Sequence, residues 1–211
     1  HHQLFDVSMK IKSIYIYFIF FCSFTFTSTF AQNECIELEK NSVIKSIEIA
    51  IDKRDFEKAE LYFNQLDSKS NYNILYKNIV SSQIFAEQNQ LEIADSLLKI
   101  TYSTFQKSPC KEILLRYYFA LGLYHIKTEQ ADSALYFLFK TIDVANELIN
   151  WEFKAKSLGR IAFIFNSLMN EPIKALHYNK QSIEEIKKTN REDLLILFQL
   201  NRLAYFGRIY D

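Results

Sequence analysis

Apolar residues recur with a helical period along most of the chain from residue 38 to residue 209, and short polar breaks interrupt this pattern. This period places apolar side chains on one face of an α-helix. Three glycines and two prolines in 211 residues leave few chain breakers, which favours a mostly helical chain. The pattern predicts helices at residues 38–52, 55–68, 72–88, 90–106, 111–128, 130–149, 151–169, 171–189 and 191–209.

The second helix of each predicted pair carries an alanine near its start. These alanines lie in the segments DFEKAELYF, QLEIADSLL, QADSALYFL and EPIKALHYN, at Ala59, Ala94, Ala134 and Ala175. Their spacings are 35, 40 and 41 residues. A helix pair that recurs at such an interval is typical of a repeat array, in which each pair buries its apolar face against its neighbours.

Gly122 lies inside an aromatic helical segment, twelve residues before Ala134. A glycine in the middle of a helix costs about 1 kcal/mol relative to alanine. A small residue at a helix crossing lets two backbones approach closely. We therefore expect Gly122 to face a neighbouring helix near Ala134, and the alternative is a glycine that is merely tolerated.

These residues resemble the tetratricopeptide repeat (TPR) family, whose 34-residue helix-turn-helix unit carries small residues in both helices. Leu121-Gly122 fits the Leu-Gly of the family's first helix, and Ala134 fits the small residue early in the second. The resemblance implies an all-α fold, a TPR-like right-handed superhelical solenoid of antiparallel helix pairs. The small residues that would pack the repeats are Ala59, Ala94, Gly122, Ala134, Ala162 and Ala175.

The chain also departs from the family pattern. Ser81-Ser82 stands where the second unit would carry Leu-Gly, and Ser46-Ile47 stands there in the first. The spacing between units is longer than 34 residues. The match covers about four helix pairs and one incomplete pair, and the wider class of helical-repeat arrays stays open.

The first thirty residues have a different character. Residues 1–8 precede a plausible start methionine, Met9, and we interpret them as upstream or non-native residues. Residues 9–31 have a basic start, an apolar stretch and a small-residue ending at Ala31, as in a secretory signal peptide. The alternatives are an uncleaved membrane anchor, although the stretch is short for one, and a buried soluble element. We expect residues 32–211 to form the repeat domain.

Charge and motifs exclude several functions. Lys+Arg and Asp+Glu both number 25, so no net field attracts nucleic acid. The sequence has no metal, nucleotide or nucleophile motif, so we assign no catalytic, metal or cofactor-binding residue and expect no enzyme. Cys35 and Cys110 would be able to pair after export, because oxidising conditions allow disulfides.

The resemblance also suggests where a partner would bind. In TPR arrays the first helix of each pair lines a concave surface that receives peptides or partner helices. The corresponding residues here are Tyr76, Ile79, Gln83, Arg116, Phe119, Leu123, Lys127, Lys156, Phe163 and Asn166. Burial in the core is the competing interpretation of these aromatic and apolar residues.

The expected function is therefore a non-catalytic protein-protein interaction scaffold, exported to the periplasm or cell surface. We expect the natural chain to continue past Asp211, because solenoids need a polar capping helix. The alternative is the periplasmic sensor arm of a membrane-anchored histidine kinase or transcriptional regulator whose output domain lies further on. An enzyme of unrecognised type is the third possibility. A membrane would be involved only through an uncleaved signal or a downstream span.

Overall fold

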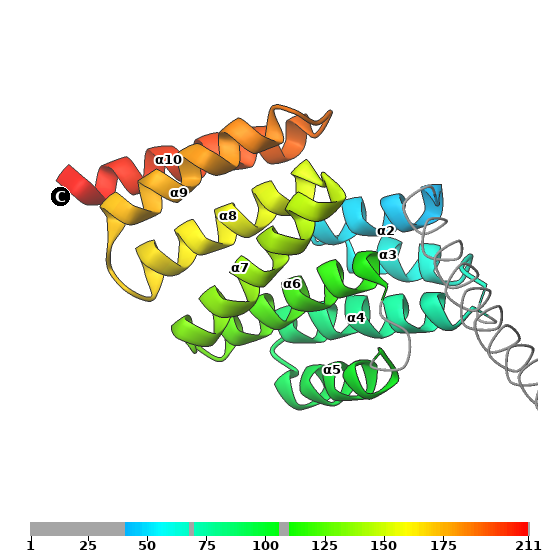
Figure 1. Ribbon diagram of the computed structural model, residues 1–211. Helices are drawn as coiled ribbons and strands as arrows, with labels where there is room; N and C mark the ends of the chain where they lie inside the picture. The colour runs from blue at the N-terminus through cyan, green and yellow to red at the C-terminus, as the bar shows by residue number, and fades with distance from the viewer. Residues whose placement is uncertain (1–40, 68–69, 106–109, 211) are drawn as a thin grey trace, which may run out of the picture.

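The computed structural model describes residues 41–67, 70–105 and 110–210, and every regular element in these ranges is an α-helix (Figure 1). The prediction of an all-α chain is thereby confirmed for this part. The expected signal peptide at residues 9–31 lies outside the described residues. None of the helices in the described ranges is long and apolar enough to cross a membrane. The helices are α2 (Ser42–Asp52), α3 (Phe56–Phe63), α4 (Asn71–Glu87), α5 (Leu91–Phe105), α6 (Lys111–Lys127), α7 (Ala131–Leu148), α8 (Trp151–Ser167), α9 (Pro172–Ile186) and α10 (Glu192–Tyr210).

Most helix ends agree with the sequence pattern to within one or two residues, and α2 and α3 differ most. Helix α2 begins at Ser42 rather than at residue 38, because the Asn41 side chain caps it by accepting a hydrogen bond from the Val43 backbone N–H. Helix α3 ends at Phe63 rather than at residue 68. Beyond it the Leu66 N–H bonds to the carbonyl only three residues back, and this tighter turn ends the helix.

The turn between the two helices of each pair has one repeated conformation. A residue with positive φ occupies each of these turns, at Arg54, Asn89, Glu129 and Asn170. Each lies five residues before the alanine of the following helix. After the first three of these residues, the next backbone N–H bonds to the carbonyl five residues back, which closes the first helix with a Schellman-type end. The turn and the alanine therefore recur together as one unit.

Helices that follow one another in the chain pack side by side. Helix α4 packs on α5, α6 on α7 and α8 on α9, while α6 also contacts α4, and α10 packs on α9 (Figure 1). Figure 1 shows the end of α2 lying close to α8, although more than a hundred residues separate them. Buried apolar residues continue from one pair into the next, so the core is extended along the array.

The inner faces of α5, α7 and α9 carry a recurring set of small and medium residues. Three of these helices place an alanine, a residue four further on and a hydroxyl residue three beyond that in the interior. The sets are Ala94, Leu98 and Thr101 in α5; Ala134, Leu138 and Thr141 in α7; and Ala175, Asn179 and Ser182 in α9. The hydroxyl groups donate to carbonyls of their own helices, so their burial leaves no donor unpaired. All nine side chains are at most 2% exposed, which makes this stripe the contact surface of each pair.

Gly122 lies at a close crossing, as expected, but its main neighbour is not Ala134. A Cβ added to Gly122 would meet the Leu138 side chain at 2.8 Å, whereas the nearest Ala134 atom is the carbonyl oxygen, at 3.7 Å. Leu138 therefore fills the space that the glycine leaves. The sequence pattern therefore predicted the correct neighbouring helix for Gly122, but the residue in contact, Leu138, lies one helical turn after the predicted Ala134.

Cys110, directly before α6, is disulfide-bonded. Cys35, the partner expected from the sequence, lies outside the described residues, as does the third cysteine, Cys22. The pairing of Cys35 with Cys110 stays a prediction.

We expect Ala134→Leu to lower the free energy of unfolding by about 1–3 kcal/mol, because the added bulk overpacks a site with no exposed surface. Tyr136→Leu, on the exposed side of the same helix, is the matched control and should change stability by less than about 0.5 kcal/mol. Urea unfolding followed by circular dichroism measures both. Equal stability of the two variants would show that Ala134 does not lie at a tight crossing.

Candidate functional site

A cavity of about 430 Å³ lies along the first helices of the pairs. It is lined by side chains from α2, α4, α6, α8 and α10. The sixth residue of α4, α6, α8 and α10 lines the cavity, and so does the thirteenth residue of α4, α6 and α8. The sixth residues are Tyr76, Arg116, Lys156 and Leu197, and the thirteenth are Gln83, Leu123 and Phe163. Residues seven apart share a helix face, so equivalent faces of four helices form one wall.

Most of the groove residues expected from the sequence come together in this cavity. Those that line it are Tyr76, Gln83, Arg116, Phe119, Leu123, Lys156 and Phe163. The structure places these seven residues around one cavity. Their role in binding a partner stays a prediction.

Ile79, Lys127 and Asn166, the other three expected groove residues, do not line the cavity. Ile79 is fully buried, whereas its neighbour Val80 takes the cavity position. Lys127 stands at the end of α6 and reaches Glu87 of α4 with its Nζ, 2.9 Å from the carboxylate. Asn166 is 8% exposed, and its backbone carbonyl accepts a hydrogen bond from Arg208.

The two phenylalanines of the expected groove differ in exposure. Phe119 is 7% exposed, and its ring packs edge-on against Phe153 with centroids 5.5 Å apart. Phe163 is 38% exposed and lies on the wall of the cavity. Phe119 is therefore mainly a core residue with one edge in the cavity, and Phe163 is the ring that a ligand can cover.

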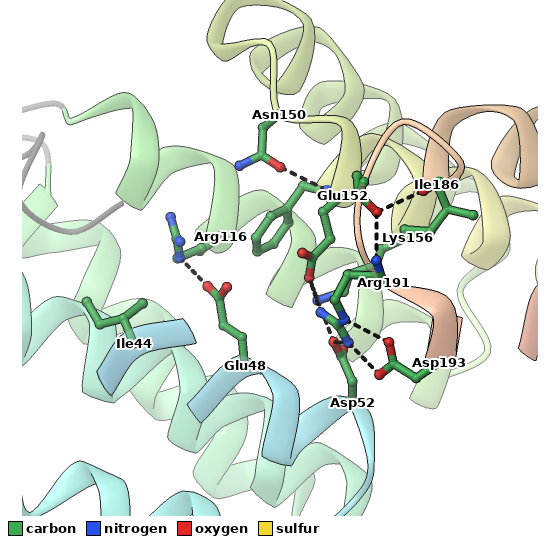
Figure 2. Close-up of polar contacts among 12 residues, drawn as sticks. Ile44, Glu48, Asp52, Arg116, Asn150, Glu152, Lys156, Ile186, Arg191 and Asp193 are labelled. Atoms are coloured by element: carbon green, nitrogen blue, oxygen red, sulfur yellow. Dashed lines mark hydrogen bonds and ion pairs between the residues drawn. The ribbon is translucent and has the colours of Figure 1, made fainter. Parts of the chain in front are cut away.

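An ionic cluster that includes the cavity residues Asp52 and Lys156 joins the first and last described helices. Arg191, just before α10, binds Asp52 at the end of α2, with Nη2 and Oδ2 2.7 Å apart. Lys156 of α8 binds the same Asp52 oxygen at 2.7 Å and Glu152 at 2.9 Å. Figure 2 shows Arg191 between Asp52 and Asp193, with Glu152 as a further partner. The chain separation of 139 residues between Asp52 and Arg191 makes this the longest-range polar contact among those described.

The contacts of this cluster favour the charged forms of Lys156, Arg191 and Asp193. Burial would lower the pKa of Lys156, but Asp52 and Glu152 outweigh it and raise that pKa. Burial also opposes the charge of Arg191, and its hydrogen bonds with Asp193 and Asp52, together with Glu152, raise its pKa. The hydrogen bond from Arg191 lowers the pKa of Asp193. These groups keep their charges at neutral pH.

Arg116 forms a second fixed ion pair in the cavity. Its Nε donates to the Glu48 carboxylate of α2 at 2.7 Å, and its Nη1 donates to the Glu112 carbonyl at 3.0 Å. The guanidinium lies over the Tyr76 and Phe153 rings, 5.7 and 5.2 Å from their centroids. The Tyr76 hydroxyl donates to the Ile44 carbonyl, and burial raises the pKa of Tyr76 well above its usual value. This arrangement ties α2, α4, α6 and α8 together around charged and aromatic groups.

Glu87 anchors a third group at the opposite end of α4. Its carboxylate accepts hydrogen bonds from Lys127 at 2.9 Å and from Arg54 at 3.3 Å. Partial burial by itself would raise the pKa of Glu87. The hydrogen bond and charge of Lys127 and the charges of Arg160 and Arg54 outweigh burial, so the pKa of Glu87 is lowered. Glu87 is therefore a stable anion on the cavity wall.

The sequence did not indicate several groups that define this cavity. Glu48, Asp52 and Arg191 look like ordinary polar residues at helix faces or ends. No local spacing connects Asp52 to Arg191, because 139 residues separate them in the chain. Arg160 was detectable, because it lies four residues, about one helical turn, after the predicted groove residue Lys156.

No group of three or more His, Cys, Asp and Glu side chains in the described ranges is arranged to hold a metal ion. Comparisons with known proteins find no matching family model, no matching curated protein and no matching solved structure.

The Asp52–Arg191 contact predicts a measurable coupling between α2 and the start of α10. A double-mutant cycle with Asp52→Asn and Arg191→Gln should give an interaction energy of about 1–3 kcal/mol, because both side chains are largely removed from water. The exposed pair Lys111–Glu147 is the control and should give less than about 0.5 kcal/mol. A coupling no larger than that of the control would mean that the two ends do not meet as described.

The lowered pKa of Glu87 predicts an acid-sensitive contribution to stability. Its stabilising effect is complete above the unfolded-state pKa, near 4.5, and is lost as pH falls through the lower folded-state value. The wild type should therefore lose more stability between about pH 5 and pH 3 than Glu87→Gln does. Thermal midpoints measured across this range test the difference, and parallel curves would exclude a contribution from Glu87.

Proposed function

We propose that the chain is a non-catalytic protein-interaction module of the TPR-like helical-repeat type, exported, whose cavity receives an apolar segment of a protein partner. The observation that carries this proposal is the solvent-accessible apolar wall formed by Phe163 and Leu197, which are 38% and 45% exposed where they line the cavity. Large aromatic side chains contribute strongly to the binding free energy of interfaces when they are not buried in the protein's own core. The pattern of residues 9–31 supports export.

The state of the charged groups supports binding rather than proton transfer. A general acid or base works best when its pKa lies near the working pH. In this cavity the pKa of Glu87 is lowered and that of Lys156 is raised, so both are moved further from neutrality. Their contacts with Lys127 and Asp52 hold helices together, which is a structural use of these charges.

The repeated helix register supports a surface that extends over several pairs. Equivalent positions in α4, α6 and α8 lie on the same wall, as a continuous peptide-binding surface requires. Three buried charged or polar groups on this wall, Arg116, Lys156 and Gln83, are fixed by the fold, so a partner would meet a preformed surface.

A photo-crosslinking amino acid at position 163 tests the proposal. It should capture a discrete protein partner in the natural host, whereas the same residue at position 173, where Ile173 is 72% exposed outside the cavity, should not. Phe163→Ala should abolish binding of the captured partner and cost less than about 1.5 kcal/mol of stability, since much of the ring already lies in water. Equal labelling from both positions, or binding that survives Phe163→Ala, would refute the assignment of this wall.

A further inference from the structure

Arg160 of α8 is the one partly buried cation on the cavity wall that has no hydrogen-bond or ion-pair partner among the described residues. Arg116 pairs with Glu48, and Lys156 pairs with Asp52. Lys53 also lacks such a partner, but it is exposed to solvent. The guanidinium of Arg160 therefore makes no direct ion pair with the charged groups that hold the helices together, although its charge acts on Glu87.

The acidic groups nearest to Arg160 are already engaged. Glu87 accepts from Lys127 and Arg54, and Asp52 accepts from Lys156 and Arg191. Burial lowers the pKa of Arg160, while Glu87 and Asp52 act in the opposite direction. A guanidinium remains charged in proteins and has five N–H donors, so partial burial without an acceptor is unfavourable until an anion arrives.

The charge balance and the walls of the cavity describe a complementary ligand. Five cationic side chains line the cavity against three acidic ones, Glu48, Asp52 and Glu87. Phe163, three residues beyond Arg160, and Leu197 of α10 supply exposed apolar surface on the same wall. Gly159 precedes Arg160, and a Cβ there would meet the Phe198 ring at 2.8 Å, so this ring of α10 packs directly onto the α8 backbone at the glycine. An anionic group flanked by apolar groups matches this surface.

We propose that Arg160 binds the carboxylate of an acidic side chain in a partner peptide whose neighbouring residues are large and apolar. This inference rests on the proposed function, because it assigns the chemistry of the segment that enters the cavity. A planar guanidinium binds a carboxylate through two parallel hydrogen bonds, and such charge-assisted bonds are stronger than neutral ones. The apolar neighbours of the acid would lie on Phe163 and Leu197.

Two acetylated and amidated five-residue peptides test this inference with the full 211-residue chain. They differ only at the centre, where a glutamate or a glutamine stands between phenylalanines. We expect the glutamate peptide to bind the wild type at least about tenfold more tightly than the glutamine peptide in calorimetric titrations. Arg160→Gln should remove this preference, and Arg160→Lys should keep part of it. Arg202→Gln, at an exposed arginine of α10 away from the cavity lining, should leave the preference unchanged.

Each other result overturns the inference. Equal binding of the two peptides by the wild type would show an apolar cavity without an anion site, and this comparison holds even if Arg160→Gln fails to fold. A glutamate preference that persists in Arg160→Gln would assign the site to another cation. Absence of binding by either peptide would reject the stated ligand chemistry. Crosslinking at position 163 then decides separately whether the proposed function also fails.

Discussion

The close crossing of the two helices in each pair is the constraint on which the rest of the structure depends. It requires a side chain no larger than a methyl group at Ala94, Ala134 and Ala175, all with no exposed surface. Leu138 then fits into the space left by Gly122. A wider crossing in one pair would displace the next pair, and the first helices would no longer present their cavity residues on one wall. The spacing of these small residues therefore determines the shape of the candidate site.

The sequence was sufficient to predict where the helices lie and which small residues mark most of the contacts between paired helices. Polar breaks separate the helices clearly, and the recurring alanines mark the crossings. The second unit lacks Leu-Gly, yet Ser82 is 2% exposed and its hydroxyl donates to the Ile79 carbonyl, so a small residue fills the same place. The departure from the family pattern changes the residue type and preserves the geometry, because the crossing requires small size and a satisfied polar group.

The cavity was harder to predict, because its details depend on rotation of a helix by about one residue and on contacts between helices that are far apart in the chain. Ile79 and Val80 are both apolar, and only the packing of α4 shows that Val80 faces the cavity. Likewise, the Glu48–Arg116 contact spans 68 residues and joins α2 to α6. Local propensity and periodicity carry no information about such a distance, which is set by the sum of several helix crossings.

The last described helix shows what the second helix of a pair contributes. The fifth, ninth and twelfth residues of α4, α6 and α8 are buried, whereas the same positions of α10 are Ile196, Leu200 and Leu203, which are 58%, 59% and 68% exposed. In α6 the twelfth residue, Gly122, is covered by Leu138 of α7. The sixth position of α10 still faces the cavity through Leu197. The ionic cluster at Arg191 fixes the start of α10 against α2, so this part of the cavity wall keeps its position.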